Sequence, residues 1–341
     1  MTERKTVFHI GYPKAGSTTL QKHLFNEHSE INNLGIFPTQ SIGRISGHRD
    51  NDCEYLKNPR LRRMYDDMVM IEGIQYDNRR MSEFFNKYIR ELVASSEVNV
   101  FSNERFTSVF FAHDDLRDKA RRIQEIAPDA KILIVIRNQF DLIKSQYRDH
   151  PMDPRSFAIG KPVSIDEWIR IARDSNAVHF LESLQYHNVI HHYKQTFGND
   201  RVEILLLEEL AQDTFTFSKR LAHFIEVDQD EVHSCLVNKK ENEGVSQVYN
   251  EFRRIRQRLI RIFDLPESLP KSVQPIIRST NRRVENYLSS SGNKERYTIA
   301  DDIKGWLEDY YTNCNLQLDE LYNLPVRKYG YPIVNNNKCY V

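Results

Sequence analysis

Short apolar runs alternate with longer segments of helical periodicity along the first two thirds of the chain. Four of the runs are rich in Val, Ile and Leu and are not interrupted by a regular polar alternation. This pattern is typical of strands that are buried on both faces of a parallel sheet. The predicted strands are residues 7–10, 98–102, 131–136 and 202–207, with residues 34–37 as a weaker fifth candidate.

Helical periodicity fills the segments beside these strands. Strands that alternate with helices predict an α/β fold, with a largely parallel sheet flanked by helices. The predicted helices are residues 18–27, 81–95, 114–127, 140–148, 178–197 and 215–225.

The last third of the chain has a different pattern. After about residue 236 only helical periodicity remains, around residues 245–262, 273–288 and 301–321. We therefore expect an α/β core over residues 1–235 and a helical C-terminal cap over residues 236–341 that completes the same domain. Residues 40–75 are polar and Arg-rich with little periodicity, which predicts an insertion over one end of the sheet.

Composition narrows the class of protein. The 341 residues include 48 Lys and Arg and 48 Asp and Glu, so the formal net charge is zero. That balance argues against a dedicated nucleic-acid-binding protein, which is usually basic. The sequence contains no run of about 18 apolar residues, so no membrane-spanning helix is predicted. The N-terminal apolar stretch is too short for a signal-peptide core. We expect a cytoplasmic protein.

Cysteine spacing gives no sign of a metal site. The four cysteines are scattered and form no C-x-x-C pair, which favours free thiols in a reducing compartment over zinc ligands or disulfides. They are Cys53, Cys235, Cys314 and Cys339.

The strongest local signal follows the first strand, where the sequence GYPKAGSTTLQ opens a helix. A strand, a Gly-containing loop and a helix N-terminus together form an anion site, because backbone N–H groups converge there and the helix dipole favours negative charge. The hydroxyls of Ser17, Thr18 and Thr19 are further donors, and Lys14 adds a positive charge. An ordinary glycine turn capped by Ser17 is the alternative interpretation.

The loop departs from the template of nucleoside triphosphatases, G-x-x-x-x-G-K-[ST]. Gly11 and Gly16 have the required spacing, but Ser17 stands where the template has lysine, and Lys14 lies earlier, inside the loop. An ATP-dependent enzyme needs that lysine on the β- and γ-phosphates and a hydroxyl on Mg²⁺. The displaced lysine argues against a kinase.

A second anion site is predicted at the end of the third strand. Arg137 follows the apolar run directly, and Ser145 lies eight residues further, about two turns into the next helix. Ligands of open α/β sheets bind at the carboxyl edge of the strands, and a guanidinium with a hydroxyl suits a buried anion. Arg137 as an ordinary surface residue is the alternative interpretation.

Together the two segments resemble the cofactor motifs of sulfotransferases that use 3′-phosphoadenosine 5′-phosphosulfate (PAPS). The resemblance implies that Lys14 contacts the sulfuryl group and that the loop holds the 5′-phosphate. It also implies that Arg137 and Ser145 hold the 3′-phosphate that distinguishes PAPS from ATP. The implied cofactor-binding residues are Lys14, Ala15, Gly16, Ser17, Thr18, Thr19, Arg137 and Ser145.

A carboxylate after the second strand is the candidate catalytic base. The acceptor hydroxyl must lose a proton as it attacks sulfur, and Glu104 lies on the ligand side of the sheet. Its position resembles that of the Glu in carbohydrate sulfotransferases. A salt-bridged structural Glu is the alternative, and His9, His113 and His150 are rival bases.

Two further segments resemble the family. Residues 204–210 look like its strand followed by acidic residues and Leu, to which we assign no catalytic role. Residues 313–321 and 328–332 together resemble the tail of bacterial members. The segment around Lys239 and Lys240 matches the family's late basic loop poorly, so their contact with the cofactor stays open.

We therefore predict an enzyme that moves a sulfuryl group from PAPS to a hydroxyl or amine of an acceptor. A glycan or glycolipid is the expected acceptor, and no obligatory metal is expected, because a sulfuryl group carries less charge than a phosphoryl group. The alternatives are a P-loop kinase that uses ATP and a non-catalytic nucleotide-binding protein. Oligomeric state is not predicted.

Overall fold

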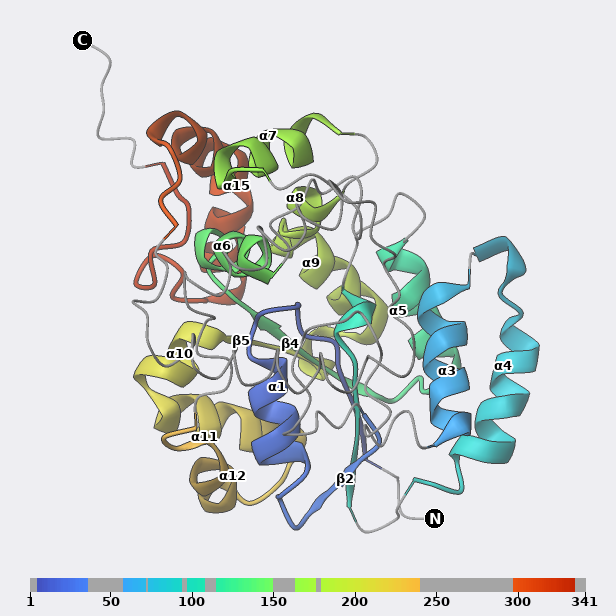
Figure 1. Cartoon of the computed structure of the whole chain (residues 1–341). Helices are drawn as coiled ribbons and strands as arrows, with labels where there is room; N and C mark the ends of the chain where they lie inside the picture. The colour runs from blue at the N-terminus through green and yellow to red at the C-terminus, as the bar shows by residue number, and fades with distance from the viewer. Residues whose placement is uncertain are drawn as a thin grey trace, which may run out of the picture.

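The computed structural model describes residues 5–35, 58–71, 73–93, 97–107, 115–149, 163–175, 179–239 and 297–334. Within these residues the strands form a five-stranded sheet in the order β2-β3-β1-β4-β5, and all neighbouring strands are parallel (Figure 1). The strands are β1 (Thr6–His9), β2 (Ile31–Asn33), β3 (Val98–Ser102), β4 (Lys131–Ile136) and β5 (Val202–Leu206).

Strand β1 is the centre of the sheet. Phe8 pairs in register with Phe101 of β3 on one side and with Ile132 of β4 on the other. All three side chains are fully buried, because helices cover both faces of the sheet. This arrangement confirms the parallel α/β fold that the unbroken apolar runs predict.

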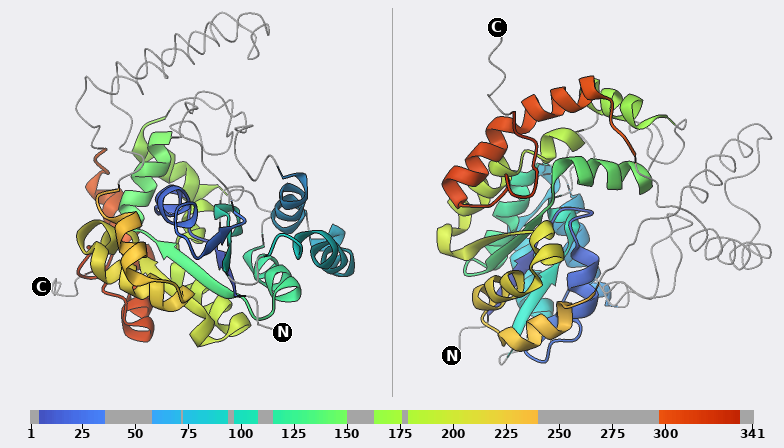
Figure 2. Two further views of the ribbon diagram at one scale, coloured as in Figure 1. Left: turned by 90° about the horizontal axis from the view of Figure 1, so that it is seen from below. Right: turned by 90° about the vertical axis from the view of Figure 1, so that its left-hand side faces the viewer.

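Helices occupy both faces of the sheet. Helix α1 and its continuation η1 lie on one face, and α5 and α9 lie on the other (Figures 1 and 2). Helix α11 packs against β5, α12 packs against η1, and α15 packs against α9. The helical segments are α1 (Ser17–Thr19), the π-helical η1 (Leu20–Phe25), α3 (Pro59–Met70), η2 (Gly73–Gln75), α4 (Asn78–Phe84), η3 (Phe85–Ile89), η4 (Glu104–Phe106), α5 (Leu116–Ile126), α6 (Gln139–Asp149), α7 (Ile165–Asp174), α8 (Phe180–Ser183), α9 (Tyr186–Phe197), η5 (Asn199–Arg201), α10 (Leu207–Gln212), α11 (Thr214–Ile225), α12 (Gln229–Leu236) and α15 (Asp301–Tyr322).

The predicted fifth strand is wrong in position. It was expected at residues 34–37, whereas β2 is Ile31–Asn33. Two asparagines conceal this edge strand in the sequence, because they are polar and their partners lie far away in the chain: the side-chain amide of Asn32 donates to the Leu92 carbonyl and to Asn99 Oδ1, both at 2.8 Å. The predicted strand at residues 202–207 is one residue too long, since Leu207 begins α10.

The insertion predicted over residues 40–75 contains a regular helix, α3. The prediction that this insertion has little periodicity is therefore wrong for its described part. Asn58 caps the helix by accepting from the amides of Arg60 and Leu61, and Pro59 occupies the first turn, where its missing N–H costs nothing. The helix buries one face at spacings of three and four residues, comprising Leu61, Met64, Tyr65, Met68 and Val69. Charged residues between these positions concealed the pattern.

The C-terminal region is described only in part. Helix α15 confirms the helix predicted at residues 301–321, and it lies beside α6 and α7 in both views (Figures 1 and 2). The helices predicted at residues 245–262 and 273–288 lie outside the described residues, and the boundary between residues 235 and 236 stays a prediction. Cys235 and Cys314 are free thiols, while Cys53 and Cys339 are outside the described residues.

No helix in the described part of the chain is both long and apolar enough to cross a bilayer.

Candidate functional site

The Gly-containing loop leaves β1 alongside the end of β4. The amide of Ile10 donates to the Leu133 carbonyl at 3.0 Å, and the amide of Tyr12 donates to the Val135 carbonyl at 3.2 Å. The β1–β4 ladder therefore continues past the end of β1. The chain runs from β1 to β2 and β3 on one side, then crosses to β4 and β5 on the other, so this loop lies at the topological switch point where such sheets bind ligands.

Two residues of the loop have left-handed backbone conformations. Lys14 has φ 67° and Gly16 has φ 85°, so the chain turns sharply before α1 begins. The first helical hydrogen bond is donated by Thr19 to the Gly16 carbonyl at 2.9 Å. The amides of Ser17 and Thr18 come before that bond, as expected at the positive end of a helix.

Close packing beneath the loop leaves little room for a side chain at either of its glycines. A Cβ atom on Gly16 would lie 2.6 Å from Leu207 Cδ1, and one on Gly11 would lie 2.7 Å from His9 Nε2. The spacing of the two glycines therefore reflects the path of the backbone over these two side chains, in addition to any ligand contact.

The predicted loop residues divide into two groups by exposure. Lys14, Gly16 and Thr18 are partly exposed, whereas Ala15, Ser17 and Thr19 are buried. The Ser17 hydroxyl is buried and makes no hydrogen bond within the described structure. A buried hydroxyl without a hydrogen bond lowers stability. An anion bound above the loop would accept a hydrogen bond from this hydroxyl after a small movement of the side chain.

Arg137 lies against the loop, as predicted from its place after β4. Its guanidinium donates from Nη1 to the Lys14 carbonyl at 2.9 Å, which joins the two predicted cofactor motifs directly. The carbonyl of Arg137 accepts from the Tyr186 hydroxyl at 2.6 Å. This tyrosine packs edge-on against Tyr12 of the loop, with ring centroids 4.7 Å apart.

Ser145 lies in the second turn of α6 and is partly exposed. The helix begins at Gln139, at the edge of the sheet that carries Arg137. Asn138 caps it, accepting from the Phe140 amide at 2.9 Å. The structure thus places Ser145 on the predicted helix, and its joint role with Arg137 stays a prediction.

The turn that carries Glu104 is attached to the same loop. The Asn103 amide donates to the His9 carbonyl at 3.1 Å. The Thr107 hydroxyl lies 3.1 Å from the Gly11 carbonyl and 3.2 Å from the Glu104 carbonyl. Glu104 itself is partly exposed. The end of β3 therefore brings the candidate base to the carboxyl edge on which the loop lies.

Of the rival bases, only His9 is described, and it is fully buried. Its Nδ1 lies 2.7 Å from Ser102 Oγ, which also accepts from the Gln21 amide at 2.9 Å. Burial lowers the pKa of His9 from 6.5 to about 3, so the ring is neutral and structural. His113 and His150 lie outside the described residues.

Sequence reasoning missed a polar cluster behind Arg137. Glu208 accepts from the Asn138 amide at 2.9 Å and from the Tyr331 hydroxyl at 3.1 Å. Burial raises the pKa of Glu208, and these two hydrogen bonds oppose that rise. The available signals were an Asn that immediately precedes a helix and a Glu that follows a buried strand.

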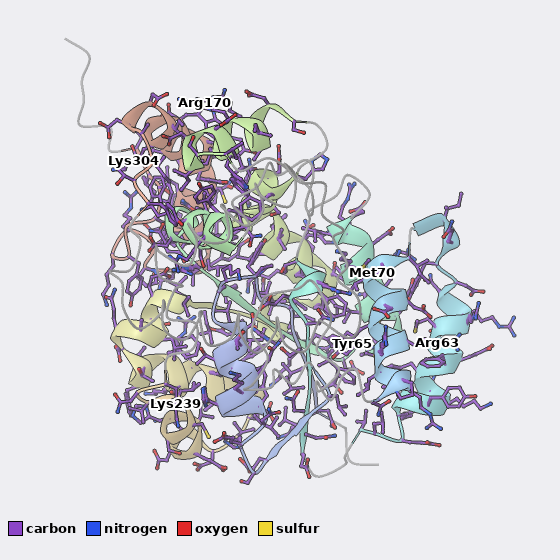
Figure 3. The ribbon with its side chains drawn as sticks, viewed as in Figure 1. Arg63, Tyr65, Met70, Arg170, Lys239 and Lys304 are labelled. Carbon is purple, nitrogen blue, oxygen red and sulfur yellow. The ribbon has the colours of Figure 1, made fainter. Side chains whose placement is uncertain are left out.

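The remaining candidates carry no structural argument for binding. Lys239 follows α12, near the lower left of Figure 3, and Lys240 is outside the described residues. Among the described residues, no three His, Cys, Asp or Glu side chains are grouped so that they could hold a metal ion. The expectation that no metal is required stays a prediction.

The fold and this edge of the sheet define a P-loop-like nucleotide-binding α/β protein. A family model described as "Sulfotransferase domain" matches residues 4–259, which is most of the chain. The chain therefore belongs to the sulfotransferase family, whose members are PAPS-dependent enzymes.

Solved structures with a similar fold include other sulfotransferases. The sulfotransferase from Alicyclobacillus acidocaldarius is 17% identical, with a TM-score of 0.43 and coverage of 76% of this chain and 96% of that one. The sulfotransferase domain from the curacin biosynthetic pathway is 12% identical, with a TM-score of 0.42 and coverage of 82% and 98%. A mouse sulfotransferase complexed with PAP is 11% identical, with a TM-score of 0.36 and coverage of 68% and 63%.

No curated protein sequence matches the chain. Because the three TM-scores lie below 0.5, the family assignment depends on the domain match and on the motifs.

Proposed function

We propose that this sulfotransferase transfers the sulfuryl group of PAPS to a hydroxyl or amine of a carbohydrate or glycolipid, with Glu104 as general base. The observation that carries the proposal is the 2.9 Å hydrogen bond from Arg137 to the Lys14 carbonyl. It brings the predicted 5′-phosphosulfate loop and the predicted 3′-phosphate arginine to one edge of the sheet.

The loop has the donors that a 5′-phosphate needs. The amides of Ser17 and Thr18 precede the first helical hydrogen bond, and the hydroxyl of Thr18 is on a partly exposed residue. The buried Ser17 hydroxyl lacks a protein acceptor in the described structure. Ala15, Gly16 and Thr19 shape the backbone around these groups. Converging amides and a helix dipole favour a phosphate at this position.

Arg137 and Ser145 are the proposed ligands of the 3′-phosphate. Guanidinium groups bind phosphate through paired donors, and Arg137 is partly exposed at the carboxyl end of β4. Among the described residues its guanidinium bonds only the Lys14 carbonyl, which leaves further N–H groups to face a ligand. PAPS supplies the activated sulfuryl group when it is bound.

Lys14 and Glu104 are the proposed catalytic residues. The Lys14 ammonium would stabilise negative charge that develops at the reaction centre. The Glu104 carboxylate would accept the proton of the acceptor hydroxyl. Both belong to turns that are tied to the Gly11–Gly16 loop, Lys14 by sequence and Glu104 through the Thr107 hydroxyl.

The cofactor is tested by thermal-shift titration with 3′-phosphoadenosine 5′-phosphate (PAP), adenosine 5′-phosphosulfate, and ATP with Mg²⁺. A ligand that binds the folded state raises the melting temperature with its concentration. We expect PAP to stabilise the protein without metal, and Arg137→Ala to weaken that effect at least tenfold in apparent Kd. Arg201→Ala is the matched control, because Arg201 also donates to a backbone carbonyl, that of Pro128, at the opposite end of the sheet.

Stabilisation by ATP with Mg²⁺ alone would overturn the proposal and favour a kinase. PAP binding without any transfer from ³⁵S-labelled PAPS to a panel of glycans, glycolipids, phenols and amines would favour a non-catalytic nucleotide-binding protein. Incorporation into phenols or amines alone would refute the proposed carbohydrate acceptor.

The base is tested with Glu104→Gln. We expect kcat to fall by about 10²–10⁴ with PAP binding unchanged. Glu97→Gln serves as a control, since Glu97 lies just before the opposite end of the same strand. A Glu104→Gln enzyme with normal kcat across pH 6–9 would eliminate Glu104 as the base.

A further inference from the structure

The three residues that follow β4, residues 137–139, form hydrogen bonds to three different helices. The Arg137 carbonyl accepts from the Tyr186 hydroxyl of α9 at 2.6 Å. The Asn138 amide donates to Glu208 of α10 at 2.9 Å. The Gln139 side chain donates from Nε2 to Asn315 Oδ1 of α15 at 2.8 Å. The peptide group that follows Arg137 is therefore bound at both its carbonyl and its N–H, and the next side chain is bound as well.

Asn138 uses both N–H donors of its side-chain amide, and the amide oxygen accepts one hydrogen bond. Its Nδ2 donates to the carbonyl of Tyr329 at 3.0 Å and to that of Gly330 at 2.7 Å. Its Oδ1 accepts from the Phe140 amide and so caps α6. A buried Asn with every donor used specifies one arrangement of the chain around it.

The acceptors of Asn138 belong to residues 324–334, which we call the C-terminal strap. The strap is also attached to Glu208 and to α15. The Tyr331 hydroxyl donates to Glu208 Oε2 at 3.1 Å, and the Pro332 carbonyl accepts from Asn315 Nδ2 at 2.8 Å. Thr312 and Asp319 of α15 accept from Val334 and Arg327 of the strap, both at 2.8 Å. Tyr331 and Asn138 are both buried. Asn138, immediately next to Arg137 in the sequence, thus contacts residues almost 200 positions later in the chain.

We propose that the C-terminal strap is part of the cofactor site, with Asn138, Glu208 and Tyr331 as positioning residues that hold Arg137 for the 3′-phosphate. This inference rests on the proposed function of Arg137 and extends it to residues that do not themselves touch the ligand. By this proposal the C-terminal strap helps the site to distinguish 3′-phosphorylated adenine nucleotides from those without a 3′-phosphate.

The geometry favours positioning over general stabilisation. A polar cluster that only stabilised the core could be replaced by apolar side chains. Its hydrogen bonds would also have no reason to converge on the backbone beside one residue. Here Tyr186 and Glu208 bind the carbonyl and the N–H of one peptide group, the one that joins Arg137 to Asn138, and the Asn138 side chain links this peptide to the strap. A displacement of this turn would move the guanidinium away from its position against the Lys14 carbonyl.

Two variants test the proposal without altering Arg137. Tyr331→Phe removes only the hydroxyl that binds Glu208. Asn138→Ser keeps an N-cap oxygen for α6 but loses the two donors to the strap. Tyr65→Phe is the matched control, because Tyr65 is also buried and its hydroxyl donates to the Leu34 carbonyl at 2.9 Å. Tyr65 lies on α3, across the molecule from α15 (Figure 3).

The measurement is the ratio of the Kd of adenosine 5′-monophosphate to that of PAP, by calorimetry, with the melting temperature of each variant alongside. We expect Asn138→Ser to lower this ratio about tenfold and Tyr331→Phe to lower it at least threefold. The Kd of the monophosphate should stay within twofold of the wild-type value. Tyr65→Phe should lower the melting temperature by a similar amount and leave the ratio unchanged.

The outcomes separate this proposal from the proposed function. A wild-type protein with no preference for PAP refutes the assignment of the 3′-phosphate site itself, and the positioning proposal falls with it. A wild-type preference that survives intact in both Asn138→Ser and Tyr331→Phe overturns the positioning proposal alone. Equal loss of the ratio in Tyr65→Phe also overturns it, because the effect would then follow general destabilisation.

Discussion

His9, which lies beneath the Gly11–Gly16 loop, makes the free energy of unfolding depend on pH. Its ring is fully buried, and burial lowers its pKa from 6.5 to about 3. Below pH 6.5 the unfolded chain binds a proton at His9 that the folded protein does not bind. The contribution of His9 to stability is therefore complete above pH 6.5 and is lost as the pH falls toward 3.

The size of the effect follows from the shift. Each pH unit in this window corresponds to about 1.4 kcal/mol, so moving from pH 7.5 to pH 5.0 costs about 2 kcal/mol from His9 alone. At the average unfolding entropy of globular proteins, a chain of this length would lose about 3 °C in Tm.

The assay is urea-induced unfolding of the wild type and of His9→Asn at pH 7.5 and 5.0, followed by fluorescence. Asn keeps a polar atom near the Nδ1 position, which faces Ser102, and it does not titrate. All other titrating groups are common to both proteins, so the difference between their pH dependences isolates His9. If the two proteins lose the same stability, within about 0.5 kcal/mol, between these pH values, the burial argument is refuted.

Three further predictions concern the backbone, an ion pair and a helix cap. Lys14→Gly should be more stable than Lys14→Ala by about 0.5–1 kcal/mol, because Gly adopts the positive φ of 67° without the steric cost of a Cβ atom, which exceeds its larger loss of backbone entropy on folding; chemical denaturation of both variants measures this. Glu226 bonds Lys131 at 2.6 Å and Lys5 at 2.8 Å, which lowers its pKa from 4.5 to about 2. Its contribution is present above pH 4.5 and lost toward pH 2, so Glu226→Gln should cost less than about 1 kcal/mol at pH 7 and nothing near pH 2. Asn58→Ala should cost about 1 kcal/mol by uncapping α3, measured by thermal unfolding.

Each of these three has a contrary outcome. Equal stability of Lys14→Gly and Lys14→Ala would mean that the loop carries no backbone strain in solution. A Glu226→Gln deficit that persists unchanged at pH 2 would show that the ion pairs are not its source. Full stability of Asn58→Ala, with Asn58→Asp as the capping-competent control, would show that water replaces the cap.

The sequence predicts the parts of the fold that depend on local burial. Strands β3 and β4 have the predicted bounds because residues 98–102 and 131–136 are nearly all buried. The position of Arg137 also follows from the sequence, since a residue after a parallel strand must lie at the carboxyl edge.

What the sequence does not predict depends on distant pairing. The sequence does not show β2, because the side-chain amide of Asn32 finds its hydrogen-bond partners 60 and 67 positions later in the chain. The polar cluster at Asn138, Glu208 and Tyr331 is unpredictable for the same reason, because no local pattern shows which three positions will meet. The Lys14–Arg137 contact needed the sheet order, which places β1 beside β4.

The central place of β1 constrains how the protein is made. Both of its neighbours lie far downstream: β3 begins at Val98 and β4 at Lys131. At about 5–20 residues per second, the ribosome releases β4 about 6–24 s after β1, and the apolar strand stays without its β4 neighbour during that time. Such non-local pairing slows folding and exposes strand edges to aggregation. Synthesis at lower temperature, or with chaperones that hold the nascent N-terminal strand, should therefore raise the yield of native protein more than changes made near the cofactor edge.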